Sequence, residues 1–329
     1  METVLKLARE SSQSVKLAYF CGAYVLAAIL LIPETFLAVL NQYPIQRFYV
    51  FIPPLIFTGL VLAALVNQPR SPFSFIRDKL VARGMGATWI ILILIMSATA
   101  FTAFKHEYSM WVPFFADQFL ADLDQVVHFG DPWRYARSIF PAALEGPLYS
   151  LYAQLWFVEV LGAVLIAAFL EDRYARERYL AAFTVTVIAL SSVVRIAGSS
   201  SGPIFYDRIF GGTRFAELID TLHSSIGGQK ILKISDYLYS SFATDTSVLG
   251  TGISAMPSVH VALAVLNAIF ATSLNKMAGA FAWAYAAAIM FGSVYFGWHY
   301  ALDAYVSIIA VTVIWRIFSK PDEKYLPST

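Results

Sequence analysis

The chain has 329 residues, of which 58% are hydrophobic and only 14% are charged. Soluble domains are about half apolar and about a quarter charged, so this composition is typical of a polytopic membrane protein. The net charge of +1 gives no reason to expect nucleic-acid binding, and the single cysteine, Cys21, excludes an intrachain disulfide.

Long apolar segments predict the fold, because a membrane-spanning helix needs about 20 mostly apolar residues. Taken in chain order, the predicted spans cover about 17–39, 48–66, 86–104, 150–170, 180–197, 255–274, 278–297 and 299–318. Pro33 in the first span and Pro53 and Pro54 in the second indicate kinks or shifted ends. The predicted fold is therefore an all-α membrane bundle of about eight spans, with the first span retained rather than cleaved as a signal peptide.

The distribution of basic residues predicts the orientation of this bundle. With the amino terminus in the cytoplasm, the cytoplasmic segments hold 14 of the 23 Lys and Arg residues and the opposite segments hold 8. Two long loops, at about 105–149 and 198–254, and the tight turn at 297–299 then share the non-cytoplasmic face.

Both long loops contain amphipathic stretches. In the first loop, Phe115 and Phe119 fall on the apolar side of a predicted helix and Asp117 and Asp124 on its polar side, which is typical of a helix in the bilayer interface. Asp124 and His128, four residues apart, are expected to form a solvated pair. In the second loop, Leu232–Phe242 has a mixed pattern suited to the border of a lipid entrance.

The segment "WHYALD" (298–303) contains two residues that suit nucleophilic catalysis. His299 and Asp303 are four apart, which on a helix places them within reach of each other. A carboxylate bonded to one imidazole nitrogen fixes the tautomer, directs the other nitrogen outward and stabilises the charge that grows as the ring attacks phosphorus.

The segment "MPSVH" suits the binding of an anion at a helix start. Pro257 disfavours helix before it, and Ser258 is a good N-cap for the span that follows. His260 then lies in the first turn, beside free N–H groups that attract phosphate, and could act as a general acid and base. A single histidine at a helix end is more often an interfacial cap, but two such motifs on one membrane face favour a phosphoryl-transfer centre without a metal or other cofactor.

These motifs carry a resemblance to a known family. "PSVH" and "SVYFGWHYALD" resemble the second and third motifs of the type-2 phosphatidic acid phosphatase superfamily, PSGH and SRxxxxxHxxxD. "MPSVH", "HYALD" and "SSGPIFYDRIFGGTRF" (200–215) are most similar to its inositol phosphorylceramide synthase-like branch, including bacterial membrane members. The resemblance is specific over about 195–305.

The resemblance implies a domain layout and a set of residue roles. Residues 1–85 would form two added N-terminal spans, 86–320 a six-helix catalytic core with interfacial loop helices, and 321–329 a cytoplasmic tail. His299 would form a phosphohistidine, with Asp303 as its orienting partner and His260 as general acid and base. Ser258 and the backbone N–H of Val259 would bind phosphate.

Four positions depart from the family motifs. The third-motif arginine is replaced by Ser293, and the second-motif glycine by Val259. The first motif, KxxxxxxRP, aligns best with Arg195 through Gly202–Pro203, so arginine replaces its lysine and glycine replaces its arginine. The phosphate then needs other cations, and the candidates near the external end of the fifth span are Arg195, Arg208 and Arg214.

The predicted function is an integral membrane lipid phosphotransferase acting on the non-cytoplasmic face. Its donor would be a phospholipid or polyprenyl phosphate, and its acceptor a lipid or polyol hydroxyl. With water as acceptor, the same site would be a phosphatase. Two other classes stay open: a lipid transporter that uses these side chains as a proton or ligand site, and a metalloenzyme with His260, His299 and Asp303 as ligands.

Overall fold

The computed structural model describes residues 2–42, 49–246 and 252–319, and the regular elements within these ranges are all helices. The long helices are α1 (Glu2–Leu31), α3 (Tyr49–Asn67), α4 (Pro72–Trp111), α8 (Trp156–Phe169), α9 (Arg173–Ala189), α14 (Val259–Leu274), α15 (Lys276–Tyr295) and α16 (Ala301–Ile317). The other helices, of which α13 is also long, are α2 (Pro33–Gln42), α5 (Asp117–Val127), α6 (Pro132–Ile139), α7 (Glu145–Tyr149), α10 (Arg195–Ala197), α11 (Pro203–Phe210), α12 (Ala216–His223) and α13 (Ile226–Ala243).

Four continuous helical segments are long and apolar enough to cross a membrane: Pro72–Trp111, Ala142–Phe169, Arg173–Ala197 and Lys276–Tyr295. The bent pair Lys16–Leu31 and Pro33–Gln42 makes a fifth if it is counted as one span, and Ile52–Asn67 and Val259–Leu274 are apolar but shorter. The prediction of an all-α membrane protein is therefore confirmed, whereas the count of eight spans stays a prediction.

The first predicted span, 17–39, is not one straight helix. The axes of α1 and α2 differ by 115° at the junction between Leu31 and Pro33. Pro33 has no N–H to continue the helix ladder, and it begins α2 at the position where a helix tolerates proline. Phe36 and Val39 are buried, so α2 folds back against α4 instead of continuing across the bilayer.

Helix α4 is longer than any predicted span. Its 40 residues extend over about 60 Å, twice the thickness of the bilayer hydrocarbon. The expected boundary at residue 85 therefore falls inside one continuous helix. Residues 105–111, expected in the first external loop, form its last two turns.

Helix α14 occupies the centre of the bundle and packs against α8, α9, α15 and α16. Its sequence is apolar all round, and a helix of that kind is stable only when it is surrounded by other elements. Asn275 then begins α15, because its side chain accepts hydrogen bonds from the backbone N–H groups of Met277 and Ala278. This cap joins α14 and α15 into an antiparallel pair.

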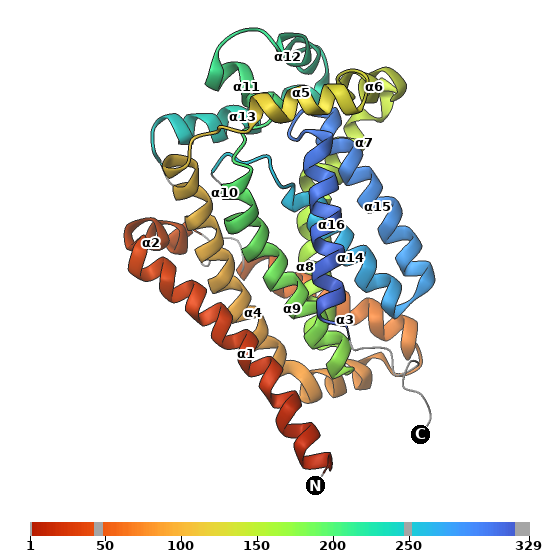
Figure 1. Ribbon diagram of the computed structural model, residues 1–329. Helices are drawn as coiled ribbons and strands as arrows, with labels where there is room; N and C mark the ends of the chain where they lie inside the picture. Colours follow the sequence, from red (N-terminus) through yellow and green to blue (C-terminus); the bar gives the residue numbers. More distant parts are fainter. Residues whose placement is uncertain (1, 43–48, 247–251, 320–329) are drawn as a thin grey trace, which may run out of the picture.

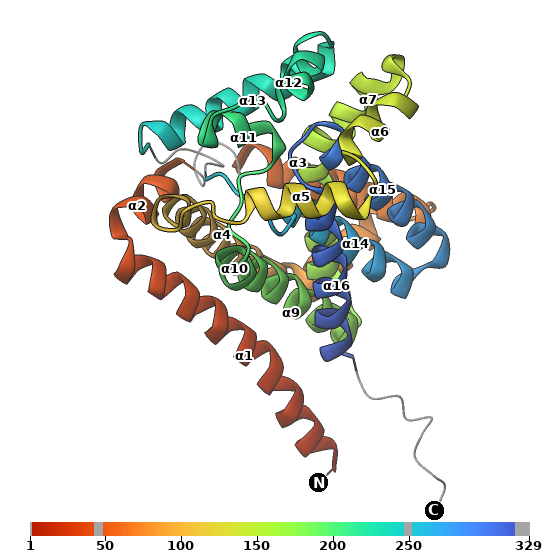
Figure 2. The same ribbon diagram turned by 45° about the horizontal axis from the view of Figure 1, so that its top comes forward.

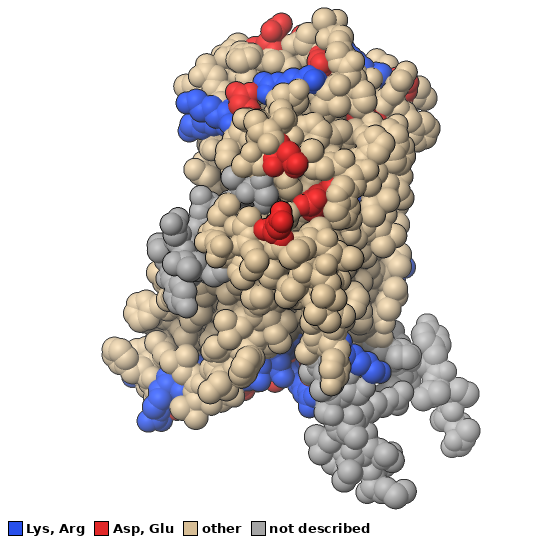
Figure 3. All heavy atoms as spheres, turned by 90° about the vertical axis from the view of Figure 1, so that its left-hand side faces the viewer, with Lys and Arg blue, Asp and Glu red and all other residues tan. Residues whose placement is uncertain are grey.

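The two ends of the bundle differ. Both termini lie at the lower end in Figure 1, and α5, α6 and α11–α13 form a layer at the upper end. Figure 2, with the top turned forward, shows α5 lying across the bundle in front of α16. One side of the molecule has Lys and Arg side chains at its lower end and both kinds of charge at its upper end (Figure 3). Some acidic side chains extend to about mid-height on this side, and the surface below them is mostly uncharged down to the lower end. This arrangement is that of a membrane protein with a covering layer on one face.

Candidate active site

His299 lies in a sharp turn between α15 and α16 and not on a helix, although the four-residue spacing was interpreted as helical. The backbone N–H groups of Trp298 and His299 both donate to the carbonyl of Ser293, at 3.0 and 3.2 Å. Gly297, with φ +71°, supplies the left-handed residue that this turn requires. Asp303 is the third residue of α16 and reaches back to the turn, so the expected contact forms by a different route.

The hydrogen bonds of His299 fix its tautomer. Its Nδ1 lies 2.8 Å from the carbonyl oxygen of Ala255 and 3.3 Å from Oδ2 of Asp303. A carbonyl oxygen only accepts hydrogen bonds, so Nδ1 must carry the proton. The lone pair of the neutral ring is therefore on Nε2, as a nucleophilic histidine requires.

Asp303 has two tasks at this turn. It is fully buried, and its Oδ2 accepts hydrogen bonds from the backbone N–H of Tyr300 and from His299. Its Oδ1 has no hydrogen-bond partner among the described residues. The carboxylate thus caps the start of α16 and places a negative charge beside the imidazole.

The predicted N-cap at the start of α14 is confirmed. Ser258 is fully buried, and its Oγ accepts a hydrogen bond from the N–H of Val261 at 3.4 Å. Val259 and His260 are the first two residues of α14, and helix geometry gives their N–H groups no carbonyl partner. These two groups are suited to an anion at the helix start, where the helix dipole also favours negative charge.

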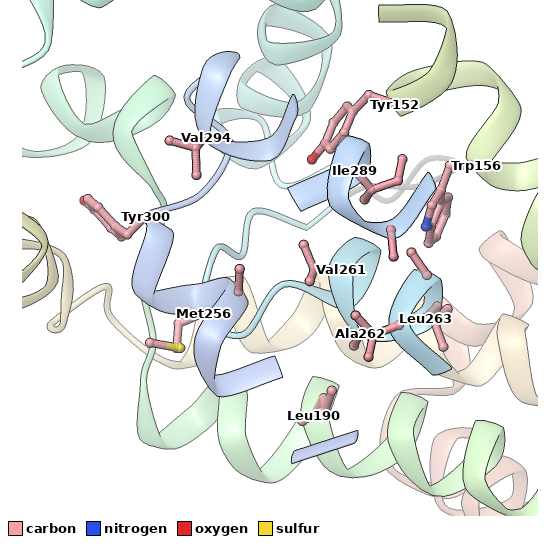
Figure 4. Packing of buried hydrophobic residues seen from close by; sticks show 14 of the residues in the cluster. Tyr152, Trp156, Leu190, Met256, Val261, Ala262, Leu263, Ile289, Val294 and Tyr300 are labelled. Atoms are coloured by element: carbon pink, nitrogen blue, oxygen red, sulfur yellow. The ribbon is translucent and has the colours of Figure 1, made fainter. Parts of the chain in front are cut away.

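His260 is held between aromatic rings. Its imidazole stacks on Trp156 with a centroid distance of 4.0 Å and on Tyr152 with one of 5.1 Å. The indole N–H of Trp156 also donates to the carbonyl of His260 at 3.2 Å. Figure 4 shows Tyr152 and Trp156 on one side of the start of α14, near Val261, and Met256 on the other. His299 and Lys105 are the ionisable groups whose charges would act on the His260 ring.

Backbone contacts join the two segments that carry these motifs. The carbonyl of Ser200 accepts from the N–H of Ala255 at 2.8 Å, and its Oγ accepts from the N–H of Met256 at 3.0 Å. The carbonyl of Gly297 accepts from the N–H of Ile204 at 2.8 Å. Residues 200–204 therefore lie between the approach to α14 and the His299 turn, and fix one relative to the other.

Helix α5 turns its acidic side inward, which corrects the expected orientation. Asp117 is fully buried and accepts hydrogen bonds from the N–H groups of Ser201 and Gly202, at 2.7 and 2.9 Å, and from the hydroxyl of Tyr300, at 2.8 Å. Buried backbone N–H groups require acceptors, and α5 supplies them. Burial raises the pKa of the Asp117 carboxyl, while the bonds from Ser201, Gly202 and Tyr300 act in the opposite direction.

Asp124 has a similar role at the start of α16. Its two carboxylate oxygens accept from the N–H groups of Ala301 and Leu302, each at 3.1 Å, and only 4% of the residue is exposed. The expected pair with His128 does form, with Nδ1 of His128 3.5 Å from Oδ1 of Asp124. The expectation that this pair is solvated is wrong, because the carboxylate is a buried helix cap. Phe119 and Val126 on α5 and Phe115 just before it are exposed, so the apolar side of this helix points away from the bundle.

The three candidate arginines differ in their contacts. Arg195 is buried and donates to the carbonyls of Lys105 and Ile253 and to Oγ of Ser109, each at 2.7 Å. Arg208 forms an ion pair with Asp236, and Arg214 forms one with Asp122. Arg195 thus joins α4 to the chain that leads into "MPSVH", and the other two lie in ion pairs of the covering layer. Phosphate binding by any of the three stays a prediction.

Gly202, one of the two positions that lack a family arginine, has no room for a side chain. A Cβ on Gly202 would lie 2.5 Å from the carbonyl oxygen of Trp298, and the φ of Gly202 is +91°. Ser293, the other position, is fully buried near the end of α15. The close contact of Gly202 with the His299 turn therefore takes the place of a side chain.

Lys105 is a cation that the sequence analysis did not select. It lies on α4, and its backbone carbonyl accepts a hydrogen bond from Arg195. Its charge acts on both Arg195 and His260, and it forms no ion pair among the described residues. In the sequence it is followed after six residues by Val112–Pro113, a spacing like that of the first family motif. This spacing is the feature of the sequence from which Lys105 could have been selected as a candidate.

One cavity that borders His299 is small. A cavity of about 10 Å³, bordered by His299, Tyr300, Asp124 and Trp133, lies between the His299 turn and helices α5 and α6. This volume holds about one water molecule. Only 7% of His299 is exposed, so the covering layer limits access of solvent to this side of the ring. Among the described residues no three His, Cys, Asp or Glu side chains form a ligand set for a metal ion.

Comparison with known proteins gives one match. A family model described as the PAP2 superfamily matches residues 118–317, which is more than half of the chain and includes both histidine motifs. No curated protein and no solved structure matches the chain.

Proposed function

Because the chain belongs to the PAP2 superfamily, and is thus an integral membrane enzyme of the lipid phosphatase or phosphotransferase type, we propose that it transfers a phosphate-bearing lipid headgroup through a phosphohistidine at His299. The observation that carries this proposal is the bond from Nδ1 of His299 to the Ala255 carbonyl, which leaves the lone pair on Nε2. The donor would be a phospholipid or polyprenyl phosphate.

The reaction would proceed in two displacements at phosphorus. In the first, Nε2 of His299 attacks phosphorus, the bond from phosphorus to the donor oxygen breaks, and His260 gives that oxygen a proton. In the second, His260 takes the proton of the acceptor hydroxyl while its oxygen attacks phosphorus, and the bond to Nε2 breaks. Asp303 stabilises the positive imidazole in both steps, and the N–H groups of Val259 and His260, with Ser258, hold the phosphate oxygens.

One observation supports transfer to an alcohol over hydrolysis. His299 is almost fully buried beneath the covering layer. Covering helices that exclude water favour an acceptor seated in the site, such as a lipid or polyol hydroxyl. Hydrolysis by the same residues is the second candidate function. The positive-inside pattern supports placing the site on the non-cytoplasmic face.

The test uses purified protein with a panel of labelled phospholipids and polyprenyl phosphates, each with and without alcohol acceptors. A new phospholipid product supports transfer, and free phosphate alone supports the phosphatase. An acid-labile, base-stable phosphoprotein should form in the wild type and in His223→Ala, an exposed histidine on α12, but not in His299→Ala. Full turnover by His299→Ala would overturn the proposal.

A further inference from the structure

A second cavity lies at the end of the bundle that carries both termini. Its volume is about 390 Å³, and it is lined by one face each of α1, α4 and α9. Its charged end is formed by Arg83 on α4 and by Arg173, Arg176 and Glu177 on α9. Apolar residues such as Leu94 and Leu180 line the rest. From Arg83 to Leu94 and from Arg173 to Thr184 the helices rise about 16 Å. The cavity is therefore polar at one end and apolar over most of its length.

This cavity is remote from the proposed active site. On α4, 22 residues separate Arg83 from Lys105, and the same number separate Arg173 from Arg195 on the segment Arg173–Ala197. Both intervals correspond to about 33 Å of helix, close to the thickness of the bilayer hydrocarbon. The two sites thus lie at opposite membrane surfaces, and the arginine end is at the surface that the positive-inside pattern assigns to the cytoplasm.

Carboxylates balance only part of the charge at this end. Glu177 pairs with Arg173 at 2.7 Å, Glu171 pairs with Lys79, and Asp172 caps α9 by accepting from Ala175. Arg83 donates to the carbonyl of Ala168, and Arg176 donates to that of Leu170. Among the residues whose side chains the structure describes, neither Arg83 nor Arg176 has a carboxylate partner within ion-pair distance.

Two details indicate that an anion would complete this group. Only 9% of Arg176 is exposed, and the charges of Arg83 and Arg173 act on it against those of Glu177 and Asp172, neither of which lies within ion-pair distance. The Nε of Arg83 is buried without a hydrogen-bond partner among the described residues, and its guanidinium lies beside Gly86, where a Cβ would be 3.2 Å from Nη1. Crowded, partly desolvated cations favour a phosphate, which guanidinium groups bind through charge-assisted hydrogen bonds.

We propose that this cavity binds one anionic phospholipid of the cytoplasmic leaflet, with its phosphate on Arg83 and Arg176 and an acyl chain along the apolar length. The cations lie at the depth of lipid headgroups, and the apolar walls extend from them into the hydrocarbon. A free phosphate ion would use the arginines alone, whereas a lipid uses both ends of the cavity. The site is distinct from the proposed catalytic centre and does not depend on its activity.

The test is native mass spectrometry of purified protein mixed with long-chain phosphatidylglycerol or phosphatidylcholine, in the His299→Ala background so that no lipid is turned over. The protein should retain phosphatidylglycerol in preference to phosphatidylcholine. Arg83→Gln/Arg176→Gln should reduce this retention at least about tenfold. The control Arg70→Gln/Arg77→Gln removes the same charge from two exposed residues near the same end and should retain the lipid.

A second variant separates charge from space. Gly86→Leu keeps every charge and fills the cavity beside the Arg83 guanidinium, so it should also lose the lipid, and it decides the outcome if the double arginine variant does not fold. Equal retention in Arg83→Gln/Arg176→Gln and in the control would overturn the proposal. So would equal retention of phosphatidylcholine, or complete displacement of the lipid by millimolar inorganic phosphate, which would indicate a site for the free anion.

Discussion

Trp156 lies over the imidazole of His260, with the ring centroids 4.0 Å apart and the planes inclined by 25°. Trp156 begins α8 and His260 lies in the first turn of α14, so this contact connects two helices at the proposed site. Tyr152, one turn earlier, stacks on the same imidazole. A general acid and base must keep its orientation through both half-reactions, and these rings provide that constraint.

Replacing Trp156 should therefore affect turnover. Trp156→Leu removes the stacked ring and should lower kcat by about three- to tenfold, since such ring pairs contribute about 0.5–1.5 kcal/mol. Trp156→Phe keeps a ring and should stay closer to wild type. The measurement is steady-state transfer to an alcohol acceptor, with Trp89→Leu, an exposed residue on α4, as control. Equal losses in the Phe and Leu variants would assign the effect to the indole N–H bond instead of the stacking.

Lys105 should contribute to phosphate binding. Loss of one charge-assisted contact to phosphate corresponds to about 1.5–3 kcal/mol, so Lys105→Met should raise KM or lower kcat/KM about 10- to 150-fold. Lys105→Arg should restore part of the loss. Lys230→Met on α13, where the ammonium lies over the Tyr149 ring, is the matched control. Unchanged kinetics in Lys105→Met would remove this residue from the site.

Asp124 should matter more for stability than its neighbour Asp122. Asp124→Ala leaves the N–H groups of Ala301 and Leu302 without their acceptor, which should cost about 1–3 kcal/mol and lower Tm. Phosphoenzyme formation should fall as well, because Ala301 follows the His299 turn directly. Asp122→Ala breaks only an exposed ion pair with Arg214 and should cost about 1 kcal/mol or less. Thermal melting of both variants in detergent compares them, and equal losses would contradict the assigned cap.

The stability of the protein should depend on pH through Asp117. Burial raises the pKa of this carboxyl above its ordinary value of about 4, so the folded state holds the proton more tightly than the unfolded state. The resulting stabilisation is present below the unfolded pKa and is lost as the pH rises through the folded pKa. The Tm of the wild type minus that of Asp117→Asn, which does not titrate, should therefore fall as the pH increases from about 4. A rising difference would show that the hydrogen bonds to Asp117 outweigh burial.

The sequence predicted the parts of the fold that depend on apolar length and capping. Ser258 begins α14 as expected, and the long apolar segments form helices. The angle between α1 and α2 could not be predicted from Pro33 alone. Proline permits a kink, but the packing of Phe36 and Val39 against α4 sets the angle of that kink. The length of α4 was missed because its polar ends lie outside any apolar window.

The sequence indicated the side chains of the candidate site but not the groups that hold them in place. Ala255 contributes only a backbone carbonyl, which no motif can reveal. The inward direction of Asp117 and Asp124 was missed because an amphipathic helix at a membrane surface has two partners, lipid and protein. Periodicity separates its two faces but does not say which one meets the bundle.

The contact between Gly202 and Trp298 has a consequence for how sequences of this kind can change. A side chain at position 202 and the present spacing of the two backbones exclude each other, so an arginine cannot be regained there by one substitution. The chain would first have to separate the segment at 200–204 from the His299 turn, losing the bonds that align both motifs. The cation that acts on His260 comes instead from α4, at Lys105.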